Sequence, residues 1–120
     1  MKIQHKNTTT YKTKDNSEIR ELLHPNNNTG VKQQSLAEAT VSCNQKTAAH
    51  FHKKTEEIYF ILKGSGQMYL AENSFDVAKG DSILIKPGQI HCIKNTGSTE
   101  LKFLCCCAPA YQHGDTFLVE

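Results

Sequence analysis

The chain has 120 residues, 38% of them hydrophobic, and its 14 basic and 12 acidic side chains leave a formal net charge of +2. This length suits one domain and leaves no room for a second. With a single arginine and no basic run longer than Lys53-Lys54, the chain is not expected to bind nucleic acid or an anionic membrane surface.

The first 34 residues are rich in Asn, Thr, Lys and Gln, and we interpret them as an N-terminal arm rather than a domain. One strand is predicted here, at Glu18–Leu23, because a dense cluster of turn residues follows it at 24–30. The chain begins without the apolar stretch of a secretory signal, so we expect a cytoplasmic protein. Five cysteines, an odd number with three of them consecutive, fit reduced thiols in that compartment.

From Ser35 onward, short runs of β-branched, aromatic and aliphatic residues alternate with turn residues, which predicts an all-β fold. The predicted barrel domain covers residues 35–107, and residues 108–120 form a C-terminal tail. Eight short strands of this kind favour a sandwich or a barrel. The predicted strands are 35–42, 50–51, 57–63, 66–72, 75–78, 82–86, 91–95 and 101–107.

Three histidines and one glutamate form the group most suited to chemistry. His50 and His52 are two residues apart on a predicted strand, so period-two alternation places both imidazoles on one face. Glu57 opens the next strand, and His91 follows a turn much later in the chain. Such a mixed nitrogen and oxygen ligand set suits Mn, Fe, Co, Ni or Zn better than Mg or Ca.

Two spacing patterns around these residues resemble the conserved motifs of the cupins. Residues 50–64 have the pattern His-x-His-x4-Glu-x6-Gly, and residues 80–95 have the pattern Gly-x7-Gly-x2-His-x3-Asn. The 15 residues between Gly64 and Gly80 match the short spacer of small single-domain bacterial cupins. The sequence departs from the second motif at Lys86, where cupins commonly have proline and this chain has Pro87 one position later.

The resemblance implies a cupin-type jelly-roll barrel, also called a double-stranded β-helix. It also implies one divalent transition metal, held by His50, His52, Glu57 and His91. The six-residue spacing to Gly64 selects Glu57 rather than its neighbour Glu56 as the carboxylate ligand.

The choice of Glu57 sets the direction of the strand that it opens. If Glu57 points into the barrel, Tyr59 and Ile61 do so as well, and Ile58, Phe60 and Leu62 point outward. Three outward apolar side chains need a cover. Two covers are open at this point, packing by the N-terminal arm and a homodimer interface of the kind common in cupins, and both can hold at once.

The glycines of Gly64-Ser65-Gly66 predict a tight hairpin between two of the strands. Pairing across it would place Met68 opposite Ile61 and Leu70 opposite Tyr59, which gives a largely apolar pocket for a small-molecule ligand. Cys107 is a further candidate for the pocket wall. The three consecutive cysteines alternate faces on their strand, so they are not expected to form a joint ligand set.

Three functions are compatible with such a site. The metal would act on a small sugar-like or carboxylate-bearing metabolite, with isomerase, epimerase or dioxygenase-type chemistry. Alternatively, the protein would be a non-catalytic, metal-dependent binding or sensor module, or the metal would only stabilise the barrel. The residues themselves do not decide whether the protein is an enzyme, and no catalytic residue is assigned.

Overall fold

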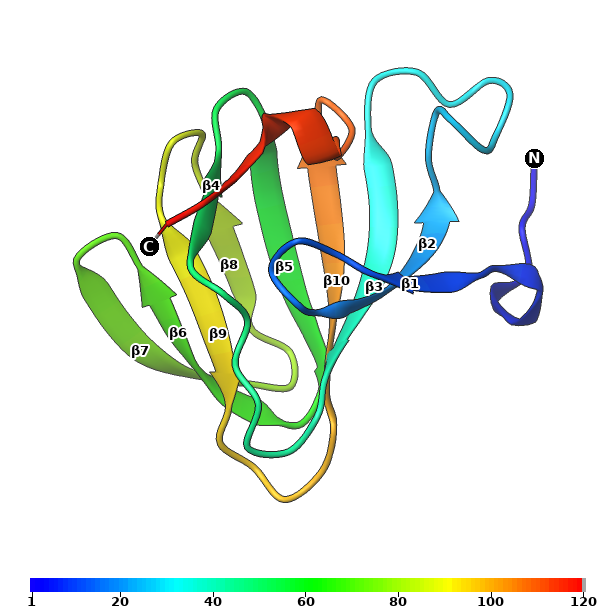
Figure 1. Ribbon diagram of the computed structural model, residues 1–120. Helices are drawn as coiled ribbons and strands as arrows, with labels where there is room; N and C mark the ends of the chain where they lie inside the picture. The colour runs from blue at the N-terminus through cyan, green and yellow to red at the C-terminus, as the bar shows by residue number, and fades with distance from the viewer. Residues whose placement is uncertain (120) are drawn as a thin grey trace.

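Two antiparallel β-sheets face each other in the computed structural model, which describes residues 1–119 (Figure 1). The six-stranded sheet has the order β1 (Thr10–Lys12), β2 (Glu18–Leu23), β3 (Ser35–Val41), β10 (Leu101–Ala108), β5 (Glu56–Lys63) and β8 (Ser82–Ile85). The five-stranded sheet has the order β11 (Thr116–Leu118), β4 (His50–His52), β9 (His91–Asn95), β6 (Ser65–Leu70) and β7 (Asn73–Ala78). This architecture confirms the predicted all-β jelly-roll barrel.

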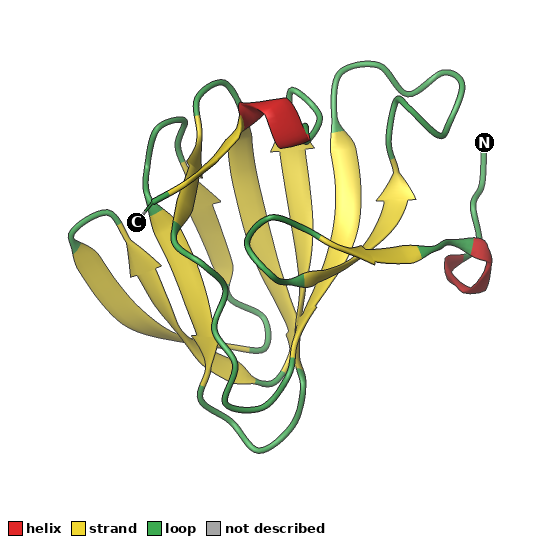
Figure 2. Ribbon diagram, in the orientation of Figure 1, coloured by secondary structure: helices red, strands yellow, loops and turns green. Residues whose placement is uncertain are grey.

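Helical structure is limited to two short 3₁₀ turns, η1 (His5–Asn7) and η2 (His113–Asp115), in the part of the chain that the structure describes (Figure 2). No helix among residues 1–119 is long and apolar enough to span a membrane. Each of the eight strands predicted between residues 35 and 107 is present, with boundaries that differ by at most two residues.

The segments outside the predicted barrel bounds add strands to both sheets. The strand expected in the arm is present as β2, which pairs with β1 and β3 and extends the six-stranded sheet at its edge. The C-terminal segment contributes β11, which pairs with β4 at the edge of the other sheet. The arm therefore continues a sheet instead of folding over its outer face.

The outer face of β5 shows that one of the two expected covers is wrong. Ile58 and Phe60 point outward as predicted, and they are 41% and 38% exposed. The arm does not cover them because its two strands lie beyond β3, with β10 and β3 between them and β5.

The turn after β5 also differs from the prediction of a hairpin. β5 pairs with β10 and β8, whereas β6 pairs with β7 and β9 in the opposite sheet. Met68 therefore lies opposite Phe75 and Ile93 rather than Ile61, and Leu70 lies opposite Asn73 and His91 rather than Tyr59. The chain crosses between the sheets at Gly64, whose φ of +87° is accessible to glycine at low cost.

The space between the sheets is filled by an apolar core to which both contribute. Ile61 and Phe103 from the six-stranded sheet and Met68 and Ile93 from the five-stranded sheet are at most 1% exposed. Burying side chains of this size stabilises a fold by about 1.5–3 kcal/mol each before the entropy cost is counted.

The corner at Gly64 generates a test of this topology. A Cβ at Gly64 would lie 2.7 Å from the Glu100 carbonyl oxygen, whereas a Cβ at Gly80, with a similar φ of +93°, would meet nothing within 4 Å. Both substitutions to alanine incur the left-handed backbone cost of about 1–2 kcal/mol. We expect Gly64→Ala to lower the free energy of unfolding by at least about 1 kcal/mol more than Gly80→Ala, because of the added overlap. Urea denaturation of both variants measures this difference, and equal losses would contradict the crossing geometry.

Candidate metal centre

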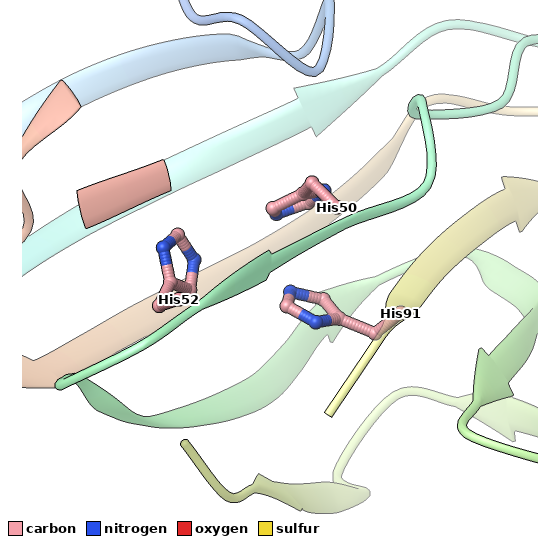
Figure 3. A group of neighbouring side chains, drawn as sticks. All are labelled: His50, His52 and His91. Carbon is pink, nitrogen blue, oxygen red and sulfur yellow. The ribbon is translucent and has the colours of Figure 1, made fainter. Parts of the chain in front are cut away.

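Two neighbouring strands of one sheet bring three histidines together (Figure 3). His50 and His52 come from β4, and His91 comes from β9, where it lies opposite His50 in the strand register. All three side chains are buried, and each offers one ring nitrogen such that these nitrogens lie within 4.8 Å of one another. Strand alternation therefore places His50 and His52 on one face, as the sequence predicts.

The fourth predicted residue reaches the cluster from the opposite sheet. Glu57 lies on β5 and is 4% exposed. Its Oε1 atom is 3.4 Å from His52 Nε2 and 3.5 Å from His91 Nε2. Glu57 thus contacts two of the three histidines, and possible donor atoms from both sheets meet at the cluster.

The protons of His50 and His91 are placed by backbone carbonyls. Nδ1 of His50 is 2.8 Å from the Ala48 carbonyl oxygen, and Nδ1 of His91 is 3.0 Å from the Gln89 carbonyl oxygen. A carbonyl only accepts hydrogen bonds, so each ring must carry a proton on Nδ1. In the neutral rings, Nε2 is then unprotonated, and its lone pair is directed into the cluster.

The same tautomer follows for His52 through a hydroxyl group. Thr116 donates its hydroxyl proton to the Gln112 carbonyl oxygen at 2.9 Å. Its Oγ1 atom is 3.1 Å from His52 Nδ1 and therefore accepts a hydrogen bond from that nitrogen. All three neutral imidazoles thus turn an Nε2 lone pair toward the shared space.

This arrangement fits a bound cation. Glu57 Oε1 and His91 Nε2 are buried and have no hydrogen-bond partner within the described chain. The imidazole lone pairs and the carboxylate oxygen that they face repel each other unless a positive charge lies between them. Transition metals bind such donors at about 2.0–2.2 Å, which puts two neighbouring donors about 2.8–3.6 Å apart. The 3.4 and 3.5 Å separations at Glu57 lie in that range.

Burial and charge move the pKa values of these groups in different directions. Burial would raise the pKa of Glu57, but His52 and His91, which donate to its carboxylate and carry charge when they are protonated, outweigh burial and lower that pKa to about 2. For His52, burial is likewise outweighed by Glu57, and the pKa is raised above its ordinary value. The pKa of His50 is lowered, chiefly by burial and next by the neighbouring His91. Glu57 is therefore ionised at neutral pH.

A cavity of about 40 Å³ adjoins His50, His52 and Glu57. Since about 10–15 Å³ of such space holds one water molecule, it has room for roughly three water-sized groups. Its wall is largely apolar, with Ile19, Ala39 and Phe103 among its residues. It also includes three tyrosines and two further carboxylates, which are Tyr11, Tyr59, Tyr111, Asp15 and Glu21. Within residues 1–119, no lysine or arginine lines this cavity.

The five predicted pocket residues divide into two groups. Tyr59 and Cys107 line the cavity, and the Cys107 thiol lies 3.3 Å from Glu57 Oε2, to which it donates a hydrogen bond. Ile61 and Met68 are fully buried in the core, Leu70 packs against that core, and none of these three is part of the cavity wall. Their placement follows from the strand pairing, because β5 and β6 do not form a hairpin.

Sequence reasoning missed one carboxylate that lies at the cluster. Asp15 is 8% exposed, lines the cavity, and has its Oδ2 atom 3.5 Å from His50 Nε2. It lies in the turn between β1 and β2, where Asn16 has a φ of +72°. Local sequence shows that residues 13–17 favour a turn, but it does not show that this turn reaches a residue 35 positions away.

Comparisons with known proteins show the family and the fold of the chain. The sequence model of the Cupin domain matches residues 38–107. An uncharacterized protein of Methanocaldococcus jannaschii, MJ1618, is 51% identical over 120 residues, which cover all of this chain and 95% of that protein. An oxalate-binding protein of Thermotoga maritima is 38% identical over 55 residues, or 46% of each chain. The structure of the polyketide cyclase RemF from Streptomyces resistomycificus aligns with a TM-score of 0.80 and 21% identity, over all of this chain and 85% of that one.

The opposite pKa shifts of His50 and His52 are testable by NMR titration of the metal-free protein. We expect His52 to titrate above, and His50 below, the ordinary imidazole pKa of about 6.5. In Glu57→Gln, the pKa of His52 should fall below that of the wild type, because the group that holds its proton has lost its charge. A His52 pKa that is unchanged in Glu57→Gln would show that Glu57 does not raise it.

Proposed function

Because the chain belongs to the cupin family, we propose that His50, His52, Glu57 and His91 hold one divalent transition metal, Mn, Fe, Co, Ni or Zn, at which a small metabolite binds and reacts. The observation that carries this proposal is the set of three Nε2 lone pairs and one carboxylate oxygen that face one another without an intervening donor. A six-coordinate metal with these four ligands keeps two positions for other donors.

The cavity wall supports an uncharged, oxygen-rich ligand of the sugar-like hydroxycarbonyl class. Asp15 and Glu21 add carboxylates to the wall, and no cationic side chain of the described chain balances them there. An anion would bind to the metal but would meet repulsion from these groups. A carboxylate-bearing metabolite remains the second ligand class to test, since one relative is an oxalate-binding protein.

A bound divalent metal supplies Lewis-acid polarisation of a carbonyl or hydroxyl oxygen, as isomerase, epimerase and dioxygenase-type chemistry requires. The hydroxyls and thiol around it keep their protons. Burial raises the pKa of Tyr111 to about 12, and it also raises the pKa values of Tyr59 and Cys107 well above neutrality. The tyrosine hydroxyls are therefore donors to a ligand oxygen rather than acceptors of its protons, while the Cys107 thiol keeps its hydrogen bond to Glu57.

The second candidate function is metal-dependent binding without turnover. It is favoured by the same observation, because Tyr59, Tyr111 and Cys107 hold their protons and cannot act as bases on a ligand. Proton NMR of metal-loaded protein with hydroxycarbonyls, or with oxalate, distinguishes the two functions. Conversion of the added compound indicates an enzyme, and broadening of its signals without conversion indicates a binding module.

We also propose a homodimer through the outer face of the six-stranded sheet. The strand register places Leu84, Ile58, Cys106 and Leu36 in one row across β8, β5, β10 and β3. Leu84 is 48% exposed, and Phe60 extends the apolar surface beside Ile58. A continuous apolar face of this kind, left open by the arm, is typical of an interface between subunits.

The metal site is tested by calorimetric titration of Co²⁺ into metal-free protein. We expect His91→Ala to weaken binding by more than about tenfold, since it removes a ligand, whereas His5→Ala, an exposed histidine of the arm, should bind as the wild type does. Affinity should fall between pH 7.5 and pH 5.5, because protons compete for the imidazoles and His52 holds its proton more strongly than usual.

Metal binding should also change the stability of the protein. The apolar core should keep the metal-free protein folded, with a melting temperature that a chelator lowers. Metal at 100 times its dissociation constant should raise the free energy of unfolding by about 2.7 kcal/mol. Binding that is independent of pH, or as tight in His91→Ala as in the wild type, would contradict the three-histidine site.

The dimer is tested by sedimentation at micromolar concentration. The wild type should sediment at twice the monomer mass of 13.4 kDa. The double variant Ile58→Lys and Phe60→Lys should be monomeric, because charged side chains at the centre of an apolar interface are costly to desolvate. Leu118→Lys, at an exposed apolar residue of the other sheet, is the matched control and should remain dimeric. A monomeric wild type would rule out this interface.

A further inference from the structure

The two carboxylate oxygens of Asp15 have different surroundings. Oδ1 accepts hydrogen bonds from the Ser17 backbone N–H at 3.0 Å, from the Ser17 hydroxyl at 2.7 Å and from the Thr13 hydroxyl. None of the hydrogen bonds within residues 1–119 involves Oδ2, which lies 3.5 Å from His50 Nε2. One oxygen thus holds the turn, and the other faces the histidine cluster.

The turn itself is attached to the five-stranded sheet and to the C-terminal segment. The Asp15 carbonyl oxygen accepts a hydrogen bond from the Ala48 N–H at 2.7 Å. The neighbouring Lys14 donates from Nζ to the His113 carbonyl oxygen at 2.7 Å and to the Thr116 carbonyl oxygen at 3.0 Å. Ala48 also holds the Nδ1 proton of His50, so this residue positions both Asp15 and the ring that Asp15 faces.

We propose that Asp15 is a fifth donor to the metal, brought to the site by the N-terminal arm. This inference rests on the proposed metal site and adds a ligand to it. The neutral His50 ring turns a lone pair toward a carboxylate oxygen, the same contact that Glu57 makes with His52 and His91. Asp15 Oδ2 meets the cluster at His50, so a cation bound to the His50 Nε2 lone pair would relieve the repulsion at this carboxylate as well.

A fifth protein donor changes what a small ligand meets at the metal. Two carboxylates and three neutral imidazoles match a divalent cation and leave a six-coordinate ion with one position for a ligand. A chelating ligand must then displace Asp15, whereas a monodentate ligand binds beside it. The arm thereby takes part in ligand selection as well as in extending the sheet.

Asp15→Asn, with Glu21→Gln as its matched control, tests the proposal. Asparagine can keep an oxygen in the turn and place its amide group toward His50, so the fold should be retained. Glu21 is another arm carboxylate in the same cavity wall, but it accepts hydrogen bonds from Tyr11 and Asn27 and does not face the cluster. Both variants remove one negative charge from the cavity.

The probe is Co²⁺ alone, titrated into metal-free full-length protein by calorimetry and followed by its visible absorption. We expect Asp15→Asn to lose at least about tenfold more affinity than Glu21→Gln and to change the Co²⁺ absorption band, which reports the ligand set. Glu21→Gln should keep the wild-type band. Melting curves of the metal-free variants show whether the fold is intact.

Other outcomes would contradict either the fifth donor alone or the whole metal site. If wild-type protein binds Co²⁺ but both variants lose the same affinity and keep the same band, Asp15 contributes only charge and the proposal fails alone. If Asp15→Asn lowers the metal-free melting temperature and leaves binding unchanged, Asp15 is solely a turn residue. If the wild type binds no metal, the proposed function fails together with the fifth donor.

Discussion

Several lone pairs face one another in a buried space at the histidine cluster. Two backbone carbonyls and one threonine hydroxyl place a proton on the outer nitrogen of each histidine, so all three inner nitrogens are acceptors. Glu57 directs an unpaired carboxylate oxygen into the same space. Buried acceptors without a donor cost several kcal/mol. A cation that binds there would remove this cost, and protons would compete with it for the same lone pairs.

The jelly-roll barrel turns this local arrangement into a link between the two sheets. The histidines belong to the five-stranded sheet, and Glu57 belongs to the six-stranded sheet. A metal held by all four residues therefore joins the sheets above the apolar core. That core includes Ile61, Met68 and Phe103, and Tyr59 belongs both to the core and to the cavity wall. Since these side chains are buried without help from the metal, stability and metal affinity can be changed separately.

The arm and the C-terminal segment complete the cavity wall from outside the central strands. Asp15, Tyr11 and Glu21 come from the arm, and Tyr111 and Thr116 come from the C-terminal segment. The donors that define the cluster therefore lie within the residues that match the Cupin domain, and much of the surface that a ligand would touch lies beyond them. Selectivity for a ligand is expected to vary with these two segments more than with the central strands.

Sequence alone determined the strands, the inward direction of His50, His52 and Glu57, and the outward direction of Ile58 and Phe60. Period-two alternation is a local property, so it can be deduced from short stretches of residues. Only the tertiary structure decided which strands pair, because Gly64 sends the chain to the opposite sheet instead of closing a hairpin. That crossing removed Met68 and Leu70 from the cavity wall. The tertiary structure also brought Asp15 to His50, since a contact between a turn and a strand far along the chain depends on the packing of the whole barrel and leaves no periodic signal.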